Sequence, residues 1–323
     1  MAVGTINTLT DVASIATIVT SKVLNYVPNY TVLSSLVTQD FSQDVATRGQ
    51  TVLIPVLGEL TVQDKTPNVA IDMIQPTGES SVSVVMNIEA YVDWGIEDLL
   101  RAVATPNLLE AYAKQSAMKL VERVESALAA LWSDFTNSNG NAGVNVTPDV
   151  IRNARKLLSD SKVPPGLFQE ANGVNFIVST KDAESIRGDQ TLSQAFSTGE
   201  MQNPSTVRTG ILGRYSGMTF YESQLMETST ANGVTTTHNM CFGREALALV
   251  SRALPKPLEG TGVISSYIQQ PLNPSTGEQT TTSGVTFQLV IGYDMANKAH
   301  RVSLGALFGV KKLRPSFGVH VKS

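Results

Sequence analysis

The stretch from Ser80 to Trp94 alternates apolar and polar residues along almost its whole length. A period of two is typical of a β-strand with one face against a core, because successive side chains point to opposite faces of a sheet. At about 3.3 Å per residue the stretch would span roughly 45 Å, several times the length of an ordinary strand. The alternation therefore predicts one very long, half-buried strand.

A second strand and a long connection precede this one. Thr51–Leu57 is predicted to be a strand, and Pro55 restricts it to a sheet edge because proline cannot donate a ladder hydrogen bond. Residues 58–79 carry turn residues at Pro67–Asn68 and Pro76–Gly78. Irregular loops of this length are uncommon inside compact domains and are usually functional. We interpret residues 58–79 as an extended hairpin arm that reaches away from the body.

The arm is predicted to be a subunit contact. Its apolar side chains cannot all be buried against each other in a thin hairpin, and an isolated two-stranded ribbon is marginal in water. Full burial of each would be favourable by roughly 1.5–3 kcal/mol, so together they favour docking on a neighbour's long helix or N-terminal arm. The predicted contact residues are Leu60, Val62, Val69, Ile71, Met73 and Ile74, with Lys65 as the one lysine of the arm.

A long amphipathic helix is predicted from Pro106 to Phe135. Its apolar positions recur every three or four residues, which places them on one face. At 1.5 Å per residue the helix would be about 45 Å long. The polar run Asn137–Asn141 is predicted to end it and to mark a domain boundary. The apolar positions are Leu109, Ala113, Ala117, Leu120, Val124, Leu128, Leu131 and Phe135.

Mixed α/β structure is predicted after this boundary. Thr147, Pro148 and Asp149 form a typical helix start, and the helix continues to Leu158. The other predicted elements are a strand at Asn175–Ser179, a helix capped by Thr180, a hairpin around Ser216–Gly217, a polar loop at Thr228–His238, and strands at Ala246–Arg252, Gly262–Gln269, Val285–Tyr293 and Leu304–Val310. Short helices are predicted in the N-terminal arm from Val12 and at Thr31–Val37.

The charge content limits the classes of function. Charged residues make up 16% of the chain and the net charge is −4, whereas about a quarter is usual. Low charge in a soluble chain indicates surface that is covered by partners. It also excludes a strongly basic nucleic-acid binder, whose affinity would come from clustered Lys and Arg. No signal peptide or membrane span is predicted, because Lys22 follows the first apolar residues instead of preceding them.

Few residues are candidates for chemistry. The single cysteine, Cys241, is predicted to be buried and inert. No pair among the three histidines has the helical spacing of a zinc site. The segment Gly213–Gly217 resembles a nucleophile elbow only superficially, because its serine comes one place too late. No catalytic, cofactor-binding or metal residue is therefore predicted.

Two charged groups need a separate interpretation. Asp93, Glu97 and Asp98 lie beside Trp94 and could form a carboxylate site for glycosides, but charging a helix N-terminus is the favoured interpretation. A basic cluster near the C-terminus could meet DNA or an acidic neighbour, but a solvated or subunit-contact role is the favoured interpretation. Its members are Lys311, Lys312 and Arg314.

Five stretches, in order along the chain, carry a resemblance to a known family. They are RGQTVLIP at 48–55, GELTVQD at 58–64, AYVDWGIED at 90–98, GILGRYSGMTFYES at 210–223 and LFGVKKLRP at 307–315. They resemble the entry to the hairpin arm, its continuation, the return strand, the shell-domain stretch and the C-terminal stretch of the major capsid proteins of tailed bacteriophages, the Hong Kong 97-like fold. The resemblance covers nearly the whole chain.

The resemblance implies an α+β fold with an N-terminal arm, an extended β-hairpin loop (E-loop), a long spine helix, and peripheral and axial domains. The implied ranges are 1–46 for the N-terminal arm, 47–95 for the E-loop and its flanking strands, 96–140 for the spine helix of the peripheral domain, 141–254 for the axial (shell) domain, 255–303 for returning peripheral-domain strands and 304–323 for a C-terminal axial-domain strand.

It further implies a structural protein, not an enzyme, that forms pentamers and hexamers of an icosahedral head around packaged double-stranded DNA. The implied partners are further copies of itself, a separate scaffolding protein, a portal, a decoration protein and non-specifically contacted DNA, with no membrane and no cofactor. The implied location is the virion capsid, assembled in the bacterial host cytoplasm. Two alternatives stay open: a glycosidase-like α/β hydrolytic enzyme, for which the arm has no use, and a tail- or portal-associated structural protein, in which β structure would dominate.

Overall fold

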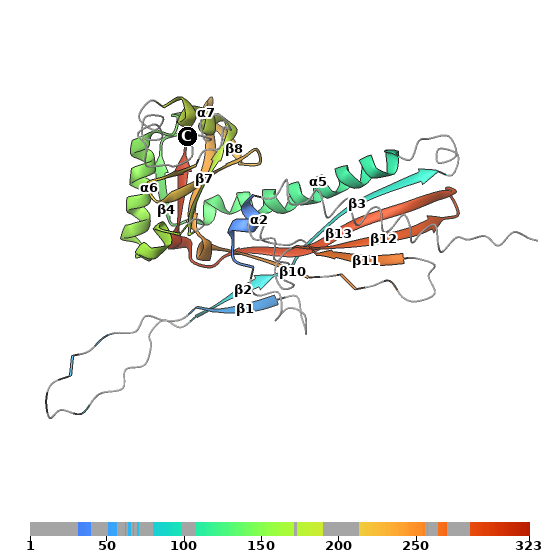
Figure 1. Ribbon diagram of the computed structural model, residues 1–323, viewed down its shortest axis with the longest axis horizontal. Helices are drawn as coiled ribbons and strands as arrows, with labels where there is room; N and C mark the ends of the chain where they lie inside the picture. Colours follow the sequence, from blue (N-terminus) through green and yellow to red (C-terminus); the bar gives the residue numbers. More distant parts are fainter. Residues whose placement is uncertain are drawn as a thin grey trace, which may run out of the picture.

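The computed structural model describes most of the chain in separate ranges. These are residues 32–39, 51–56, 80–97, 107–170, 173–189, 213–252, 264–269 and 285–323, with the single positions 62, 64, 65, 67, 70, 254, 255 and 257. For 107–110 and 264–269 only the backbone is described. A small mixed α/β body lies at one end, and a long helix and a long sheet extend away from it side by side (Figure 1).

The long sheet is built around one strand, β13 (Ala299–Lys312). β3 (Ile88–Glu97) pairs with residues 299–308 of β13, while β12 (Thr286–Asp294) pairs with 299–306 and β10 (Leu247–Arg252) with 307–312. β11 (Ile264–Gln269) joins the outer side of β12. All these pairings are antiparallel. β13 alone therefore holds three other strands in register.

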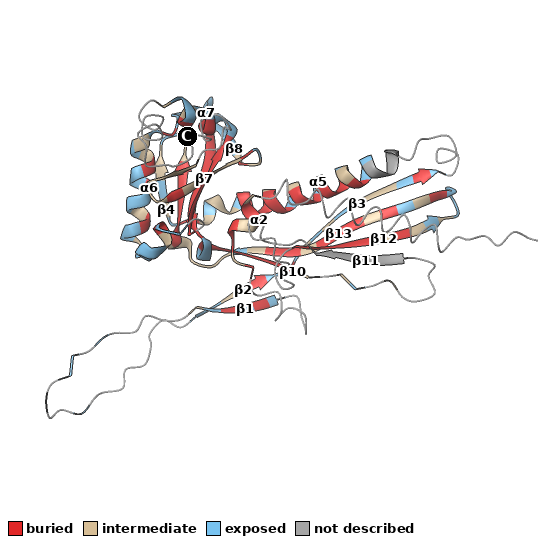
Figure 2. Cartoon of the chain, viewed as in Figure 1, coloured by how far each residue is buried: buried red, intermediate tan, exposed pale blue. Residues whose placement is uncertain are grey.

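The long helix α5 (Asn107–Ala129) covers one face of this sheet (Figure 1). Its buried side carries most of the predicted apolar stripe and shares one hydrophobic core with residues of β3 and β13. The buried parts of α5 and β13 are red in Figure 2. The helix continues into a short 3-10 turn, η2 (Ala130–Asp134). The buried residues are Ala113, Ala117, Leu120, Val124 and Leu128 on the helix, and Val302, Leu304, Ala306 and Phe308 on β13. The predicted long amphipathic helix is confirmed.

The second sheet has seven strands and forms the mixed α/β body. Its order is β4 (Asn137–Gly140), β14 (Gly318–Lys322), β9 (Val234–Gly243), β5 (Val174–Ser179), β7 (Met218–Ser223) and β6 (Arg214–Tyr215), with β8 (Thr228–Ala231) paired to the first half of β9. Two pairs, β4–β14 and β5–β7, are parallel. Three short 3-10 turns lie in or next to this body: η3 (Pro165–Phe168), η4 (Arg244–Ala246) and η5 (Pro315–Phe317).

Two helices accompany the seven-stranded sheet, α6 (Pro148–Asp160) and α7 (Thr180–Gly188). The hydroxyl of Thr147 accepts the backbone N–H of Val150, which satisfies one of the open donors at the start of α6. This confirms the predicted cap. At α7 the cap is Ser179, whose hydroxyl accepts the N–H of Asp182, so the prediction of Thr180 was wrong by one residue.

A separate two-stranded ribbon is formed by β1 (Thr51–Val56) and β2 (Ser80–Val85), which pair antiparallel. Its inner face packs on β10 of the five-stranded sheet. The buried cluster between them comprises Val52, Ile54, Val84, Met86, Ala248 and Val250. The predicted strand with Pro55 at a sheet edge is confirmed, because β1 is paired on one side only.

The prediction of one continuous strand over Ser80–Trp94 was wrong. The chain leaves strand geometry at Met86–Asn87, so that β2 belongs to the ribbon and β3 to the five-stranded sheet. The break lies over Gly309 of β13, where an added Cβ would collide with the carbonyl oxygen of Val85. The alternation of burial nevertheless continues through the break, since Val84 and Met86 are buried and Val85 and Asn87 exposed. A change of sheet that keeps the inward face leaves no trace in the apolar pattern.

Two predicted loops are strands. Asn137–Gly140 does end the helical region, but it forms β4 by parallel pairing with β14. Its asparagines serve this role, because the Asn139 amide donates to the carbonyl oxygen of Val150 at 2.7 Å. Residues 228–238, predicted as a polar loop, form the β8–β9 hairpin, whose turn is Asn232–Gly233 with φ of 53° and 78°. Asparagine and glycine tolerate this left-handed backbone at low cost.

Two strand pairings cross the predicted domain ranges, which stay a prediction. β10 lies within the predicted axial range 141–254, yet it pairs with β13 in the five-stranded sheet. Residues 304–312 lie within the predicted C-terminal axial strand, yet they complete β13. Only β14, after the turn η5, enters the seven-stranded sheet. Within the described ranges no helix is long and apolar enough to cross a membrane.

Cys241 lies in the middle of β9 and has no solvent exposure. Its thiol packs against the sulfur of Met218 at 3.5 Å. Burial raises the pKa of the Cys241 thiol far above its ordinary value, because the thiolate would lose its hydration. The reactive species in thiol chemistry is the thiolate.

We therefore expect Cys241 to be inert toward a thiol reagent such as Ellman's reagent in native buffer and to react fully once the chain is unfolded in guanidinium. Absorbance of the released chromophore measures both states. Rapid stoichiometric labelling of the native protein would contradict the burial of β9, and a Cys241→Ala variant provides the blank.

Candidate functional site

The β1–β2 ribbon is the first candidate surface for contact with another molecule. Its inner face is fixed to β10, but its outer face carries apolar side chains in solvent: Leu53 is 65% exposed and Val85 is 44% exposed. Of the predicted contact residues on the arm, Val62 is 91% exposed and Lys65 is exposed. The others, Leu60, Val69, Ile71, Met73 and Ile74, lie outside the described residues. An anchored ribbon with an uncovered apolar outer face has the chemistry of a docking element.

A second candidate surface is the segment at residues 32–39. The short helix α2 (Leu33–Leu36) has no side-chain cap of its own. Instead the carboxylate of Glu125 on α5 accepts the backbone N–H of Leu33 at 2.7 Å and that of Ser34 at 2.9 Å. A carboxylate at a helix N-terminus satisfies open donors and complements the helix dipole. Burial raises the pKa of Glu125, and these backbone hydrogen bonds oppose the rise.

The same segment is also tied to the five-stranded sheet. Thr38 forms a parallel bridge with Ala248, in which its N–H donates to the carbonyl oxygen of Leu247 at 3.1 Å and its own carbonyl accepts the N–H of Leu249 at 3.0 Å. Residues 32–39 are thus held between the long helix and β10. This places residues 32–39, which belong to the predicted N-terminal arm, beside the β1–β2 ribbon, since both contact β10.

The predicted basic cluster is largely paired within the chain. The ammonium of Lys312 lies 3.3 Å from the carboxylate of Asp134, and the guanidinium of Arg314 lies 3.0 Å from that of Glu245. Arg314 also stacks over the ring of Phe317. Lys311 is exposed. With two of the three cations neutralised locally, the field that could reach DNA is weaker than the sequence indicates, and a role in contacting DNA or a subunit stays a prediction.

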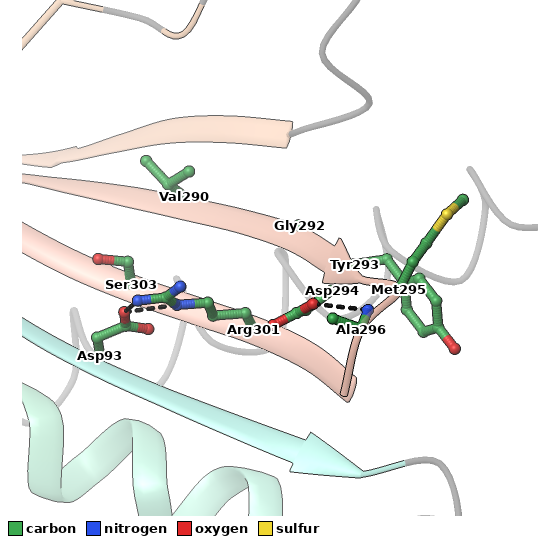
Figure 3. Close-up of a pocket in the computed structure, with 9 residues that line it drawn as sticks. All are labelled: Asp93, Val290, Gly292, Tyr293, Asp294, Met295, Ala296, Arg301 and Ser303. Atoms are coloured by element: carbon green, nitrogen blue, oxygen red, sulfur yellow. Dashed lines mark hydrogen bonds and ion pairs between the residues drawn. The ribbon is translucent and has the colours of Figure 1, made fainter. Parts of the chain in front are cut away.

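The candidate carboxylate site does not assemble. Asp93 and Trp94 are consecutive in β3, so their side chains point to opposite faces of the sheet. Asp93 accepts from the guanidinium Nε of Arg301 at 2.6 Å on one face, as Figure 3 shows, while Trp94 stacks on Tyr112 of α5 on the other. Glu97 is exposed at the end of β3, and Asp98 lies outside the described residues. Asp93 or Glu97 was interpreted as a charge at a helix N-terminus. Asp93 does not have this role, because its partner is Arg301.

A shallow hollow of about 720 Å³ surrounds this ion pair at the end of the five-stranded sheet (Figure 3). Its other acid, Asp294, accepts the N–H of Ala296 at 2.9 Å and the amide of Asn297 at 2.8 Å, and these bonds lower the pKa of Asp294. Both carboxylates therefore have structural partners, Asp93 in an ion pair and Asp294 in the β12–β13 turn. The hollow offers no pair of carboxyl groups with separated acid and base roles.

The chemically richest cluster is one that the sequence analysis missed. The Ser229 hydroxyl lies 2.8 Å from His238 Nε2, and His238 Nδ1 lies 2.9 Å from His320 Nε2. A serine beside an oriented imidazole has the outline of a nucleophile and base. Neither hollow described for the surface, at the β12–β13 turn or beside Thr38 and Arg314, is lined by these residues, so a substrate has no described place to bind there.

Metal binding finds no support in the described part of the chain. It contains no group of three or more His, Cys, Asp or Glu side chains that could hold an ion. His238 and His320 are hydrogen-bonded to each other, and the second ring nitrogen of His238 is hydrogen-bonded to Ser229.

The fold was compared with known proteins. No protein-family model matches the chain, and no curated protein matches its sequence. Solved structures do match. A structure of Mycobacterium phage Che8 aligns with a TM-score of 0.62 at 20% identity, over 90% of each chain. The capsid of Ralstonia phage GP4 gives 0.60 at 11% identity, over 90% of this chain and 87% of that one. The mature capsid of bacteriophage PhiM1 gives 0.55 at 13% identity, over 86% and 83%.

The similarity extends over nearly the whole length of both partners in each case, so it concerns the complete architecture and not one shared motif. The chain therefore has the α+β fold of these phage capsid structures. At such identities the comparison establishes the fold, and function requires a separate argument.

The Glu125 anchor yields a test. Glu125→Ala removes the acceptor of two buried N–H groups, which should lower the free energy of unfolding by on the order of 2–3 kcal/mol and expose residues 32–39 to protease. Glu125→Gln keeps the shape and one acceptor oxygen and should lose about half as much. Urea unfolding and limited proteolysis measure the two effects. Equal stability of wild type and Glu125→Ala would show that the carboxylate does not hold α2.

Proposed function

We propose that this chain is the major capsid protein of a tailed bacteriophage, which assembles from pentamers and hexamers into an icosahedral head enclosing double-stranded DNA. The observation that carries the proposal is the match to phage capsid structures over about nine-tenths of the chain. In this proposal the architecture is Hong Kong 97-like, with the five-stranded sheet and α5 as the peripheral domain and the seven-stranded sheet as the axial domain.

The arrangement of the described surfaces supports a role in assembly. The ribbon β1–β2 is rooted on β10 by buried Val52, Ile54 and Val84, while Leu53 on the other face is left in solvent. A monomeric protein gains nothing from an anchored ribbon with an apolar outer side, because that side becomes favourable only when a neighbour covers it. We therefore assign residues 58–79, together with the outer face of the ribbon, as the contact to an adjacent copy.

The low charge supports the same role. With 16% charged residues and a net charge of −4, the chain can face packaged DNA without binding it strongly. The paired states of Lys312 and Arg314 agree with such a surface. A separate scaffolding protein, a portal and a decoration protein are the partners that the proposal adds, in a virion assembled in the host cytoplasm.

The arm is the decisive part to test. Replacing residues 58–79 by Asn-Gly should leave both sheets folded, because the described contacts of β1 and β2 with β10 lie outside the replaced segment. The shortened chain should keep native circular dichroism and the native unfolding midpoint, yet form no shells or capsomer rings. Electron microscopy and sedimentation of the protein expressed with its natural partners measure assembly.

Single substitutions make the test sharper. Val62→Ser removes an exposed apolar group from the arm, and Val144→Ser removes one from the loop after β4, where the side chain is 53% exposed. Val62→Ser should reduce assembly and Val144→Ser should not. Normal shells from the shortened chain would show that the arm is not the assembly element and would remove the main physical support for the proposal.

A further inference from the structure

At the end of the long helix, the side chain of Trp132 in η2 contacts the seven-stranded sheet. Its indole stacks on the imidazole of His238 with ring centroids 3.7 Å apart and planes 2° apart. Its ring nitrogen donates to the carboxylate of Glu227 at 2.7 Å. His238 lies on β9, and Glu227 directly precedes β8. Trp132 thus joins the helix to two neighbouring strands of the other sheet.

A second imidazole completes this contact. His320 of β14 lies 2.9 Å from His238, nitrogen to nitrogen, and its ring centroid is 4.4 Å from that of Trp132. Both histidines are buried. A hydrogen bond between two imidazoles needs one N–H and one bare nitrogen, so the pair is stable only while at least one ring is neutral. Two imidazolium rings would oppose two N–H groups and two like charges at this distance.

Burial opposes protonation of both rings, and the nearby charges act differently on each. Glu227 favours a positive His238, whereas Lys322, which is paired in register with His238 on β14, disfavours it. Asp134, on the same 3-10 turn as Trp132, is engaged by Lys312. Burial lowers the pKa of His238. The pKa of His320 is lowered to about 4, mainly by burial and further by the neighbouring His238 and Lys322.

A base whose pKa is lower in the folded state binds fewer protons there than in the unfolded chain. Its contribution to stability is therefore complete above the ordinary histidine value of 6.5 and is lost as the pH falls from 6.5 toward about 4. The loss should be felt first where the pair makes its contacts, between η2, β9 and β14.

We propose that Trp132, His238 and His320 form an acid-sensitive latch that holds the end of the long helix against the seven-stranded sheet and opens when the histidine pair is protonated. Opening would free the two sheets to change their relative orientation, because the stack and the Trp132–Glu227 hydrogen bond are direct side-chain contacts across that junction. The latch is a property of the single chain and does not depend on the proposed assembly.

The chain offers a direct optical readout. It contains two tryptophans, Trp94 and Trp132, so Trp94→Phe in the full-length protein leaves Trp132 as the sole emitter. On lowering the pH from 7, we expect the Trp132 emission to shift to longer wavelength between pH 6.5 and about 4, reversibly, while far-ultraviolet circular dichroism stays native. In the same background His320→Gln and His238→Gln should abolish this shift or move it by about one pH unit or more.

Two control variants separate the latch from general acid effects. His300→Gln changes the third histidine, on β13, and should leave the transition unchanged. Glu227→Gln keeps an acceptor for the Trp132 ring nitrogen but cannot titrate, and it should also preserve an acid transition. A transition unchanged in both latch variants, or equally displaced by His300→Gln, would overturn the proposal, as would an emission that stays constant until the whole fold is lost.

If a glutamine variant does not fold, hydrogen exchange on the unsubstituted protein tests whether the latch opens at low pH. After correction for the intrinsic pH dependence of exchange, an open latch should accelerate exchange selectively in residues 130–134, 228–238 and 318–322. Uniform acceleration over both sheets, or none, would contradict a local opening.

Discussion

The length of β13 is the constraint on which the rest of the structure depends. A strand of 14 residues with a buried face can align β3, β12 and β10 at once, and its inward side chains supply the surface that α5 covers. The chain then turns through η5 and enters the other sheet as β14, with only five residues between the end of β13 and the start of β14. The backbone thus joins the two sheets here and again where β9 passes through η4 into β10, and the helix end adds side-chain contacts such as the stack of Trp132 on His238.

Local periodicity was sufficient for elements whose partners repeat at regular intervals. The stripe on α5, the alternation on β3 and the Thr147–Pro148 cap each carry their own signal, and the structure confirms them. The break at Met86 carries none, because the strand changes sheets without turning its apolar face. β4 is stabilised by a partner near the opposite end of the chain, so a run of asparagines gave no strand signal. The Asn232–Gly233 turn was a readable hairpin signal that the interpretation as a polar loop overlooked.

The candidate site was less predictable than the fold. Lys312 and Arg314 were predicted to belong to a basic cluster, but their acidic partners, Asp134 and Glu245, come from distant segments. His238 and His320 are 82 residues apart and lie on different strands, so only the antiparallel pairing of β9 with β14 brings them together. The contact role of the apolar arm residues stays a prediction, and among them the structure describes Val62, which is exposed. Matches at 11–20% identity fit this division, because inward-facing patterns and tight spots such as Gly309 can fix an architecture while most side chains vary.

The Glu125 contact also has a consequence for the order in which the chain folds. α2 has four residues, far fewer than an isolated helix needs in water, and its first two amides rely on a carboxylate more than 90 positions later in the sequence. It has no means of nucleating alone. Residues 32–39 are therefore expected to become ordered only after α5 and β10 are in place, although they are synthesised before both. Pulse-labelled hydrogen exchange would show this as late protection of the Leu33 and Ser34 amides, so that a segment synthesised before α5 and β10 becomes ordered after them.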